Sequence, residues 1–328
     1  MFSYLLKRLF GLIPLLIGIS LMSFFVIHLS PGSPTDAALG DLNPKVSYEA
    51  RQKMEKLYDL DKPLWVQYKK WFTRILRFDF GTSLADGRPV IDKFLETIPV
   101  TLAVNGLSLL LILLFGIPAG VIAAVKKGAL FDKMSAVVMF AAFALPAFWL
   151  ALVLMDLFGV KLGWLPVSGL TSLDFEYFSG PQKIADLARH LALPVAVSAL
   201  ASLAGISRYI RNQMNDVLEK PYILAARSRN LPERVVLYKH GLKNALLPVI
   251  SILGLSVPGL IGGSVIFESI FAIPGTGRLF FLSVMSRDYP VIMAMLVTTA
   301  FLTIIGSLLA DLGYACVDPR IRYAAEEK

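Results

Sequence analysis

Long runs without a charged residue dominate the pattern of hydrophobic and polar positions along this chain. A membrane-crossing helix needs about 20 predominantly apolar residues, and most of the runs reach that length. One run is near the lower limit of about 17 and needs part of the polar segment after it as an interfacial extension. The pattern predicts six transmembrane helices, at Phe10–Ser30, Thr97–Val125, Met134–Met155, Leu191–Ser207, Ala245–Phe267 and Pro290–Ala310.

Composition indicates the same class. The chain is 56% hydrophobic and 17% charged, with a mean hydropathy of +0.65, whereas soluble domains are about 45–50% apolar and about 25% charged. Pro146 and Pro194 fall inside predicted spans, where membrane helices tolerate proline. The first run is too long for the apolar region of a signal peptide, so we expect a retained helix. The sequence thus predicts an all-α integral membrane protein.

The positions of lysine and arginine predict the orientation. A loop longer than roughly 60 residues does not direct topology, which removes residues 31–96 from the count. The other polar segments hold 16 basic residues on the side of both termini and 5 on the opposite side. We therefore expect a multi-pass protein of the plasma (inner) membrane with both termini in the cytoplasm. The net charge of +8 falls on the inner side, and anionic lipid explains it without nucleic acid.

Between the fourth and fifth spans lies a polar interruption, residues 208–244. Its centre predicts a short helix that begins at Pro221, whose missing N–H has no partner at a first helical position. Asn230 stands where a residue with positive φ ends such a helix. Pro232 is predicted as the first residue of a second helix, with Glu233 placed to favour the new helix dipole.

Two small residues, Ala225 and Ala226, give the first helix a patch that a partner's groove could close around, ringed by Arg227, Arg229 and Arg234. This arrangement is typical of a segment that another protein grips. The alternative is an ordinary cytoplasmic connector built from helix-forming alanines. These residues alone favour neither interpretation.

Motifs for chemistry are missing from the sequence. No stretch matches a P-loop, an H-E-x-x-H helix or a G-x-S-x-G turn. A single cysteine, Cys316, excludes a disulfide within the chain, and the three histidines lack metal-ligand spacing. His28 is interpreted as a packing residue. We expect no catalytic, cofactor or metal site, and because no span carries an ionisable side chain at mid-depth, energy for transport would come from another subunit.

The spans carry modest polar groups instead. Such residues usually join membrane helices through hydrogen bonds and close packing, which is the first interpretation for each of them. They are also the candidates for lining a transport pathway, together with a carboxylate just after the fifth span. The candidates are Asn105, Ser108, Ser251, Ser256, Ser264 and Glu268.

The segment from Tyr222 to Pro248 carries a family resemblance. Ala225-Ala226, the stop at Asn230 and the later Asn244-Ala245-Leu246-Leu247-Pro248 resemble the EAA coupling loop of binding-protein-dependent ABC importer permeases. Asn230 replaces the family's glycine and Leu224 its leading glutamate, and the second departure is usual in the dipeptide, oligopeptide and nickel branch. The resemblance assigns the ATPase-coupling contact to Tyr222, Leu224, Ala225, Ala226, Arg227, Asn230, Leu231 and Pro248.

Further strings along nearly the whole chain resemble the B-type permease of that branch. Each string is weak alone, and their order and spacing together carry the resemblance. They include Ser30-Pro31-Gly32-Ser33-Pro34, Asp79-Phe80-Gly81-Thr82-Ser83, Ile98-Pro99-Val100-Thr101-Leu102, Gly163-Trp164-Leu165-Pro166, Pro274-Gly275-Thr276-Gly277-Arg278, Arg287-Asp288-Tyr289-Pro290 and Asp318-Pro319-Arg320-Ile321-Arg322.

The resemblance implies a type I ABC importer permease fold that works by alternating access. The chain would supply half of a translocation pathway and no chemistry, because separate subunits hydrolyse ATP. The implied partners are a second homologous permease, two ABC ATPase subunits, an extracytoplasmic substrate-binding protein and membrane lipid. Dipeptides or oligopeptides are the expected substrate, with nickel chelates, glutathione and oligosaccharides left open.

Four regions follow from this interpretation: an N-terminal transmembrane helix (1–30), an external helical region (31–96), the core (97–315) with the coupling loop at 208–244, and a cytoplasmic tail (316–328). The external region has Trp65, Tyr68, Trp71 and Phe72 at helical spacing, and it would seat the binding protein or pack as a lid on its own subunit. Residues 271–278 would form a short re-entrant corner outside, whose glycines allow positive φ and close helix approach.

Two other classes compete with the importer subunit. One is a channel or secondary transporter that works alone, and the lack of mid-membrane ionisable residues and of an evident inverted repeat counts against it. The other is a membrane enzyme, which the lack of a catalytic cluster disfavours.

Overall fold

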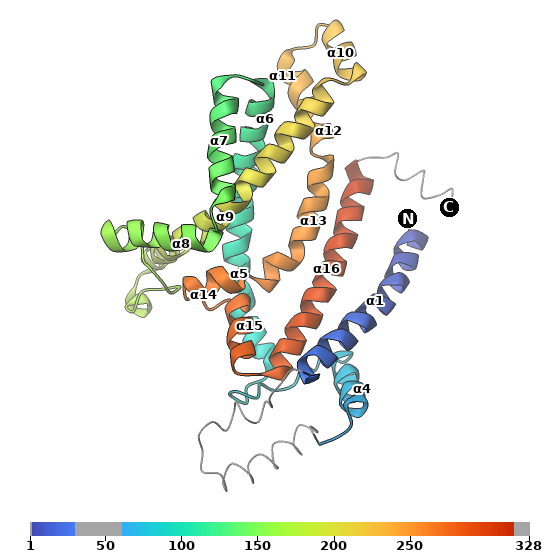
Figure 1. Cartoon of the computed structure of the whole chain (residues 1–328), viewed down its shortest axis with the longest axis vertical. Helices are drawn as coiled ribbons and strands as arrows, with labels where there is room; N and C mark the ends of the chain where they lie inside the picture. Colours follow the sequence, from blue (N-terminus) through green and yellow to red (C-terminus); the bar gives the residue numbers. More distant parts are fainter. Residues whose placement is uncertain (1, 30–60, 318–328) are drawn as a thin grey trace.

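The computed structural model describes residues 2–29 and 61–317, and this part of the chain is almost entirely helical (Figure 1). The elements are α1 (Phe2–Leu29), α4 (Leu64–Ile75), α5 (Val90–Leu111), η1 (Ile112–Gly116), α6 (Ile117–Val125), α7 (Leu130–Ala144), α8 (Ala147–Met155), η2 (Asp156–Lys161), η3 (Phe175–Tyr177), α9 (Gly180–Leu218), α10 (Pro221–Ser228), α11 (Glu233–Val235), η4 (Val236–Leu242), α12 (Lys243–Ala245), α13 (Leu247–Gly262), α14 (Val265–Ile270), α15 (Thr276–Met285) and α16 (Tyr289–Val317).

Three segments of the described chain are long and apolar enough to cross a membrane: Val90–Val125, Leu247–Ile270 and Tyr289–Gly313. The number rises to five if two bent pairs each count as one span. The pairs are Leu130–Ala142 with Ala147–Lys161, and Gly180–Leu200 with Ser202–Leu218. The first predicted span lies in α1, whose described apolar part is shorter, at Ile13–Leu29. Helices occupy most of every predicted span, whereas the number of membrane crossings stays a prediction.

The third predicted span, Met134–Met155, is not one straight helix. α7 ends at Ala144 because Leu145 is extended, with φ −80° and ψ 133°. The ring of the following Pro146 disfavours helical geometry in the residue before it. The helix after the proline then leaves at 93°. Pro194, in contrast, lies inside α9 without ending it.

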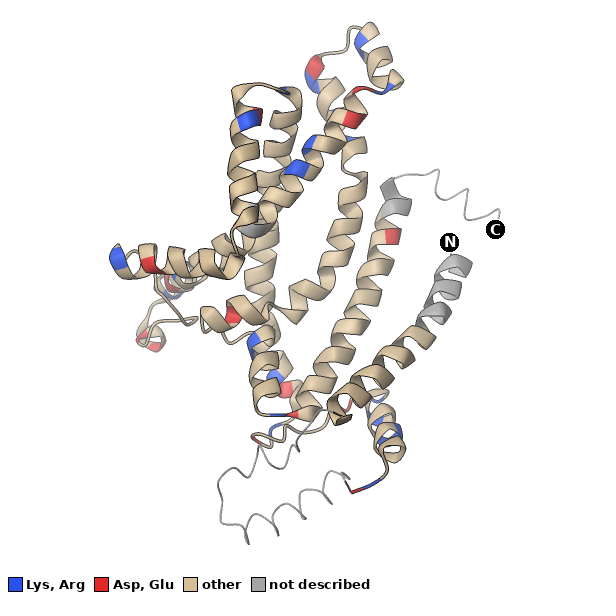
Figure 2. Ribbon diagram, in the orientation of Figure 1, with Lys and Arg blue, Asp and Glu red and all other residues tan. Residues whose placement is uncertain are grey.

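The long helices α1, α5, α13 and α16 run along the molecule, with α10 at one tip and α4 and α15 toward the opposite end (Figure 1). α13 and α16 approach closely at two glycines, since a Cβ added to Gly254 would lie 2.6 Å from the carbonyl oxygen of Gly306. Figure 2 shows charged residues toward the ends of the helices, while the middle parts of α13 and α16 carry none. This distribution is that of helices crossing a hydrocarbon layer.

The described part of the predicted external region contains one helix and an irregular segment. α4 confirms the helical spacing of Trp65, Tyr68, Trp71 and Phe72. α5 begins at Val90, so residues 90–96 belong to a long apolar helix rather than to a separate cap. The remainder of that region, residues 31–60, and the tail after residue 317 lie outside the described residues.

Candidate functional site

α10 forms as the sequence predicts. Pro221 occupies the first helical position, after an extended Lys220 with φ −75° and ψ 147°. The helix ends at Ser228, and Asn230 then takes a left-handed conformation with φ 54°. The N–H of Asn230 donates to the carbonyl of Arg227 at 2.9 Å. The predicted left-handed stop is therefore confirmed.

The second helix begins one residue later than predicted. Pro232 has φ −55° and ψ 135°, which is not helical, and Glu233 is the first residue of α11. Pro232 acts as the N-cap, because its carbonyl accepts the N–H of Val235 at 2.8 Å. Glu233 also reaches back across the turn, where its carboxylate lies 2.7 Å from the Arg227 guanidinium. This contact with Glu233 raises the pKa of Arg227 above its ordinary value and connects the two short helices.

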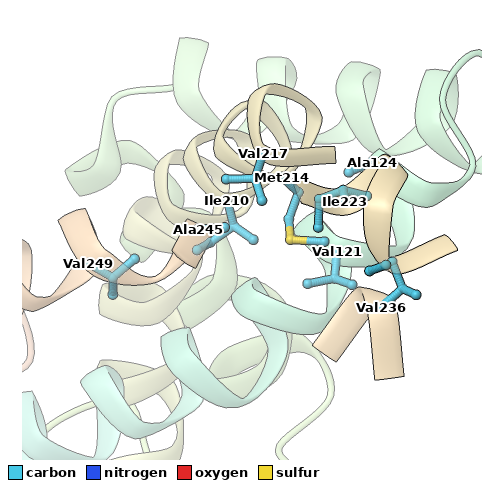
Figure 3. Close-up of a cluster of buried hydrophobic side chains, with 10 residues drawn as sticks. Val121, Ala124, Ile210, Met214, Val217, Ile223, Val236, Ala245 and Val249 are labelled. Carbon is cyan, nitrogen blue, oxygen red and sulfur yellow. The ribbon is translucent and has the colours of Figure 1, made fainter. Parts of the chain in front are cut away.

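The two faces of α10 have different surroundings. Ile223 is fully buried and packs into the cluster of side chains in Figure 3. Ala226 is 7% exposed and belongs to the same cluster. Tyr222 and Leu224 are 44% and 57% exposed, and Ala225 is exposed beside them. Neighbouring residues of a helix point about 100° apart, and the low exposure of Ala226 shows that it points into its own chain, so of the two alanines only Ala225 belongs to the outward side. We call Tyr222, Leu224 and Ala225 the α10 outer face.

The buried side of α10 contacts several membrane helices at once. The cluster draws on α6, α9, α10, η4, α12 and α13. Its members are Val121, Ala124, Ile210, Met214, Val217, Ile223, Ala226, Val236, Ala245 and Val249. Densely packed side chains transmit displacement rather than absorbing it. A movement imposed on α10 would therefore reach α6, α9 and α13 directly.

The other predicted coupling residues lie at the turn or beyond it. Arg227, Asn230 and Leu231 are exposed, whereas Pro248 is half-buried in the first turn of α13. Pro248 therefore shapes the connection to α13 and is not part of the exposed tip.

The predicted pathway candidates in the spans mostly make contacts between or within helices. The amide of Asn105 donates to the Gly259 carbonyl at 2.8 Å, which joins α5 to α13. The buried Ser108 hydroxyl lies 2.7 Å from the Val104 carbonyl, and that of Ser256 donates within α13. Ser264 caps α14 by accepting the Phe267 N–H, and Ser251 is half-buried on α13. Asn105, and Ser108 through a further contact with the Val195 carbonyl at 3.3 Å, therefore join helices, whereas Ser256 and Ser264 make contacts within one helix.

Glu268 forms a buried clasp rather than an open lining. Its carboxylate is 2% exposed and accepts the hydroxyl of Thr101 at 2.9 Å and the N–H of Arg278 at 3.0 Å. Thr101 in turn accepts the N–H of Thr276 at 2.8 Å. One carboxylate therefore joins α5, α14 and the first turn of α15, where the helix dipole favours a negative charge.

The corner at residues 271–278 is present, but its glycines act differently from the prediction. Positive φ falls on Ala272, at 51°, and not on Gly275 or Gly277. These two glycines allow close approach, because a Cβ on Gly275 would lie 2.5 Å from the Thr101 hydroxyl oxygen and one on Gly277 would lie 2.7 Å from the nitrogen of Val265. The absence of a side chain is what lets the corner wrap the Glu268 carboxylate.

Sequence reasoning missed a second buried carboxylate at the same end of the molecule. Asp288 is 1% exposed and accepts the Ser83 hydroxyl and the N–H of Leu84. Lys93 donates to Ser83 at 2.9 Å and lies 2.8 Å from Asp86. The network fixes the segment before α5 to the turn before α16. Ser83 and Asp288 belong to two of the sequence strings that resemble the permease branch, but nothing in the sequence indicates that the two residues contact each other.

These elements define a class of protein. Apolar helices, charged ends and one protruding pair of short helices describe a multi-pass helical membrane protein. Among the described residues, no three His, Cys, Asp or Glu side chains lie close enough to hold a metal ion.

Comparison with known proteins gives the family. The sequence profile described as binding-protein-dependent transport system inner membrane component matches residues 116–323, and the profile of the N-terminal component of such proteins matches residues 1–105. The chain belongs to this family. It is a permease subunit of a binding-protein-dependent transport system and not itself catalytic.

Curated relatives match over nearly the whole chain. The oligopeptide transport system permease protein AppB of Bacillus subtilis (strain 168) is 43% identical, over 98% of this chain and 100% of AppB. The di/tripeptide transport system permease protein DppB of Pseudomonas aeruginosa is 37% identical, over 98% of this chain and 99% of its own length. The glutathione transport system permease protein GsiC of Escherichia coli (strain K12) is 35% identical, over 98% of this chain and 100% of GsiC.

Proposed function

We propose that this chain forms half of the membrane pathway of an ATP-driven importer that takes up dipeptides or oligopeptides. The observation that carries the proposal is the geometry of α10. It presents an outer face of Tyr222, Leu224 and Ala225 at one tip of the molecule, while Ile223 and Ala226 on its other face pack against the membrane helices. A partner that grips the outer face can therefore move the helices through the buried face.

The partner at α10 would be an ATPase subunit. The outer face offers an aromatic ring, a leucine and a small residue, which is the combination that a closed, desolvated groove can bury. Arg227 and Arg229 at its rim are suited to acidic groups around such a groove. With two ATPases and a second permease, closure of the ATPases would pull both α10 helices and open the pathway toward the outside.

The proposed topology has six crossings, with both termini and α10 in the cytoplasm. It counts α7 with α8 as one bent crossing and α9 as another. The end that carries α4, residues 79–89 and the α14–α15 corner would then face outward and receive the substrate-binding protein. The Glu268 clasp joins three elements there, so it is placed to hold the outer ends of α5, α14 and α15 in register.

Peptides are the proposed substrate because AppB and DppB are named for peptide transport and match this chain from end to end. Glutathione, itself a tripeptide, is the second candidate through GsiC. The polar side chains described above do not separate these two, because most of them are engaged in helix contacts.

The decisive experiment reconstitutes the full-length chain with its second permease and ATPases in proteoliposomes. We expect uptake of a labelled peptide only when the loaded binding protein and ATP are both present. A cysteine at Leu224 should form a crosslink to an ATPase subunit, whereas one at the exposed Lys161 should not. Uptake by the chain without ATPase subunits would support the channel or secondary transporter instead.

A further inference from the structure

α4 has an uncovered apolar edge beside a basic groove. Tyr68 and Trp71 face α1, where Tyr68 lies 2.9 Å from the Ser20 hydroxyl and both rings contact Phe24. Trp65 and Leu76, further round the helix, are both 67% exposed. The described chain therefore covers only part of the apolar face of α4.

The groove runs along the polar side of the same helix. It measures about 530 Å³ and is lined by Lys69, Lys70, Thr73, Arg74, Arg77 and Asp79. Arg74 holds the single carboxylate at 2.8 Å and lowers the pKa of Asp79, which keeps that side chain charged. Four basic side chains against one acid give the groove a net positive charge.

The position of α4 along α1 determines whether its apolar edge and basic groove contact water, lipid headgroups or acyl chains. The two α4 rings that face α1 both contact Phe24, which stands five residues before Leu29, the end of α1, or about 8 Å along a helix. α1 is apolar over this stretch, and Met22 and Val26 beside it are strongly exposed. A hydrocarbon core of about 30 Å within a total of about 40–45 Å leaves a headgroup layer of about 5–8 Å on each side. With the end of α1 at the outer edge of that layer, α4 contacts α1 at the boundary between acyl chains and headgroups.

We propose that α4 and residues 76–79 form a binding site for an anionic phospholipid in the leaflet at that end of the molecule. Trp65 and Leu76 would enter the acyl region, while Lys69 and Arg77 bind the headgroup phosphate. An amphipathic helix with Trp and Leu on one edge and Lys and Arg on the other is the usual form of an interfacial lipid-binding helix. The long stems of Lys and Arg can follow the apolar edge while their charges reach the phosphate.

An acidic soluble protein is the competing occupant of the groove. It is disfavoured because the apolar edge lies beside the lipid-facing surface of α1, where a soluble partner does not reach. The lipid site does not depend on the proposed substrate or on which side of the membrane is the cytoplasm.

The test uses the full-length chain in nanodiscs with equal amounts of phosphatidylglycerol and phosphatidylcholine. After mild detergent extraction, native mass spectrometry counts the lipids that stay bound. We expect phosphatidylglycerol to be retained in clear excess. Each basic side chain near a membrane surface contributes about 1 kcal/mol, or about fivefold, so Lys69→Gln with Arg77→Gln should bring the excess down at least fivefold.

Two variants control for charge and for folding. Lys126→Gln with Lys161→Gln removes the same charge at exposed positions elsewhere and should retain the excess. Lys69→Arg with Arg77→Lys keeps the charge of the groove and should also retain it. Equal retention of the two lipids by the unaltered chain, or an equal loss in both charge-removing variants, would overturn the proposal.

A second measurement reads the site within the bilayer. A spin label on Thr73→Cys, with Cys316→Ser, should become less mobile as phosphatidylglycerol replaces phosphatidylcholine. An unchanged spectrum would contradict the lipid site. Immobilisation only after addition of the substrate-binding protein would assign the groove to that protein.

Discussion

The two alanines of α10 offer a matched pair of substitutions, because they are adjacent in sequence but one is exposed and the other is buried. Ala225→Trp adds an indole ring to the exposed outer face. Ala226→Trp adds the same ring where the side chain is 7% exposed, against the cluster that contains Ile223 and Met214. The first change should alter binding to a partner, and the second should alter the packing of the chain itself.

The expected magnitudes follow from these surroundings. Overpacking a buried site costs about 1–3 kcal/mol, so Ala226→Trp should lower the unfolding temperature of the purified chain. Surface substitutions are usually within about 0.5 kcal/mol, so Ala225→Trp should leave it unchanged. If an ATPase groove closes on Ala225, the indole should reduce recovery of the ATPase at least tenfold, which corresponds to about 1.4 kcal/mol.

The assay compares three quantities for each variant: the unfolding temperature in detergent, co-purification of the ATPase subunits, and peptide uptake in proteoliposomes. We expect Ala225→Trp to be stable, poorly associated and inactive in uptake. Ala225→Ser, a small replacement at the same position, should behave as the unaltered chain. A stable Ala225→Trp variant with full ATPase recovery and full uptake would refute the assignment of the outer face.

Three further predictions concern the conformation, the topology and the corner. Asn230→Gly should keep the φ of 54° and retain the ATPase, whereas Asn230→Val should strain the turn by about 1–2 kcal/mol and reduce co-purification; equal recovery of both contradicts this. In a Cys316→Ser background, an impermeant thiol reagent should label Ala85→Cys in intact cells and not Ser228→Cys, and the reverse pattern would invert the topology. Glu268→Gln should lower stability by about 1–3 kcal/mol, because an amide NH₂ would face donors now bound by oxygen; an unchanged unfolding temperature would show that the clasp contributes little.

The sites for the topology test show that the sequence does not predict which residues of a polar segment are buried. Ser83 stands in a polar stretch and suggests an accessible position, but it is fully buried against Asp288. Its partner lies 205 residues away, and no local pattern links them. Ala85, two positions later, is exposed.

The sequence predicted helix ends correctly where the residues that determine them are neighbours in the chain. The start of α10 at Pro221 and its stop at Asn230 depend on backbone geometry within a few residues, and both were predictable. The break of the third predicted span at Pro146 is also local, yet tolerance of proline in membrane helices made a continuous helix equally acceptable. The extended Leu145 shows that here the backbone bends instead.

Glu268 shows why polar residues near apolar spans were the hardest to interpret. A carboxylate in such a place can face a water-filled pathway or be satisfied by the protein, and both cases look alike in sequence. Here the carboxylate is hydrogen-bonded within the protein, and its partners come from two elements distant in sequence, Thr101 on α5 and the N–H of Arg278 at the start of α15. Because these donors and the glycine contacts leave the carboxylate 2% exposed, a passing substrate would meet it only after the corner had opened. The residue therefore belongs with the elements that hold this end of the molecule together, and we expect its effect on transport to come through their arrangement and not through direct contact with a peptide.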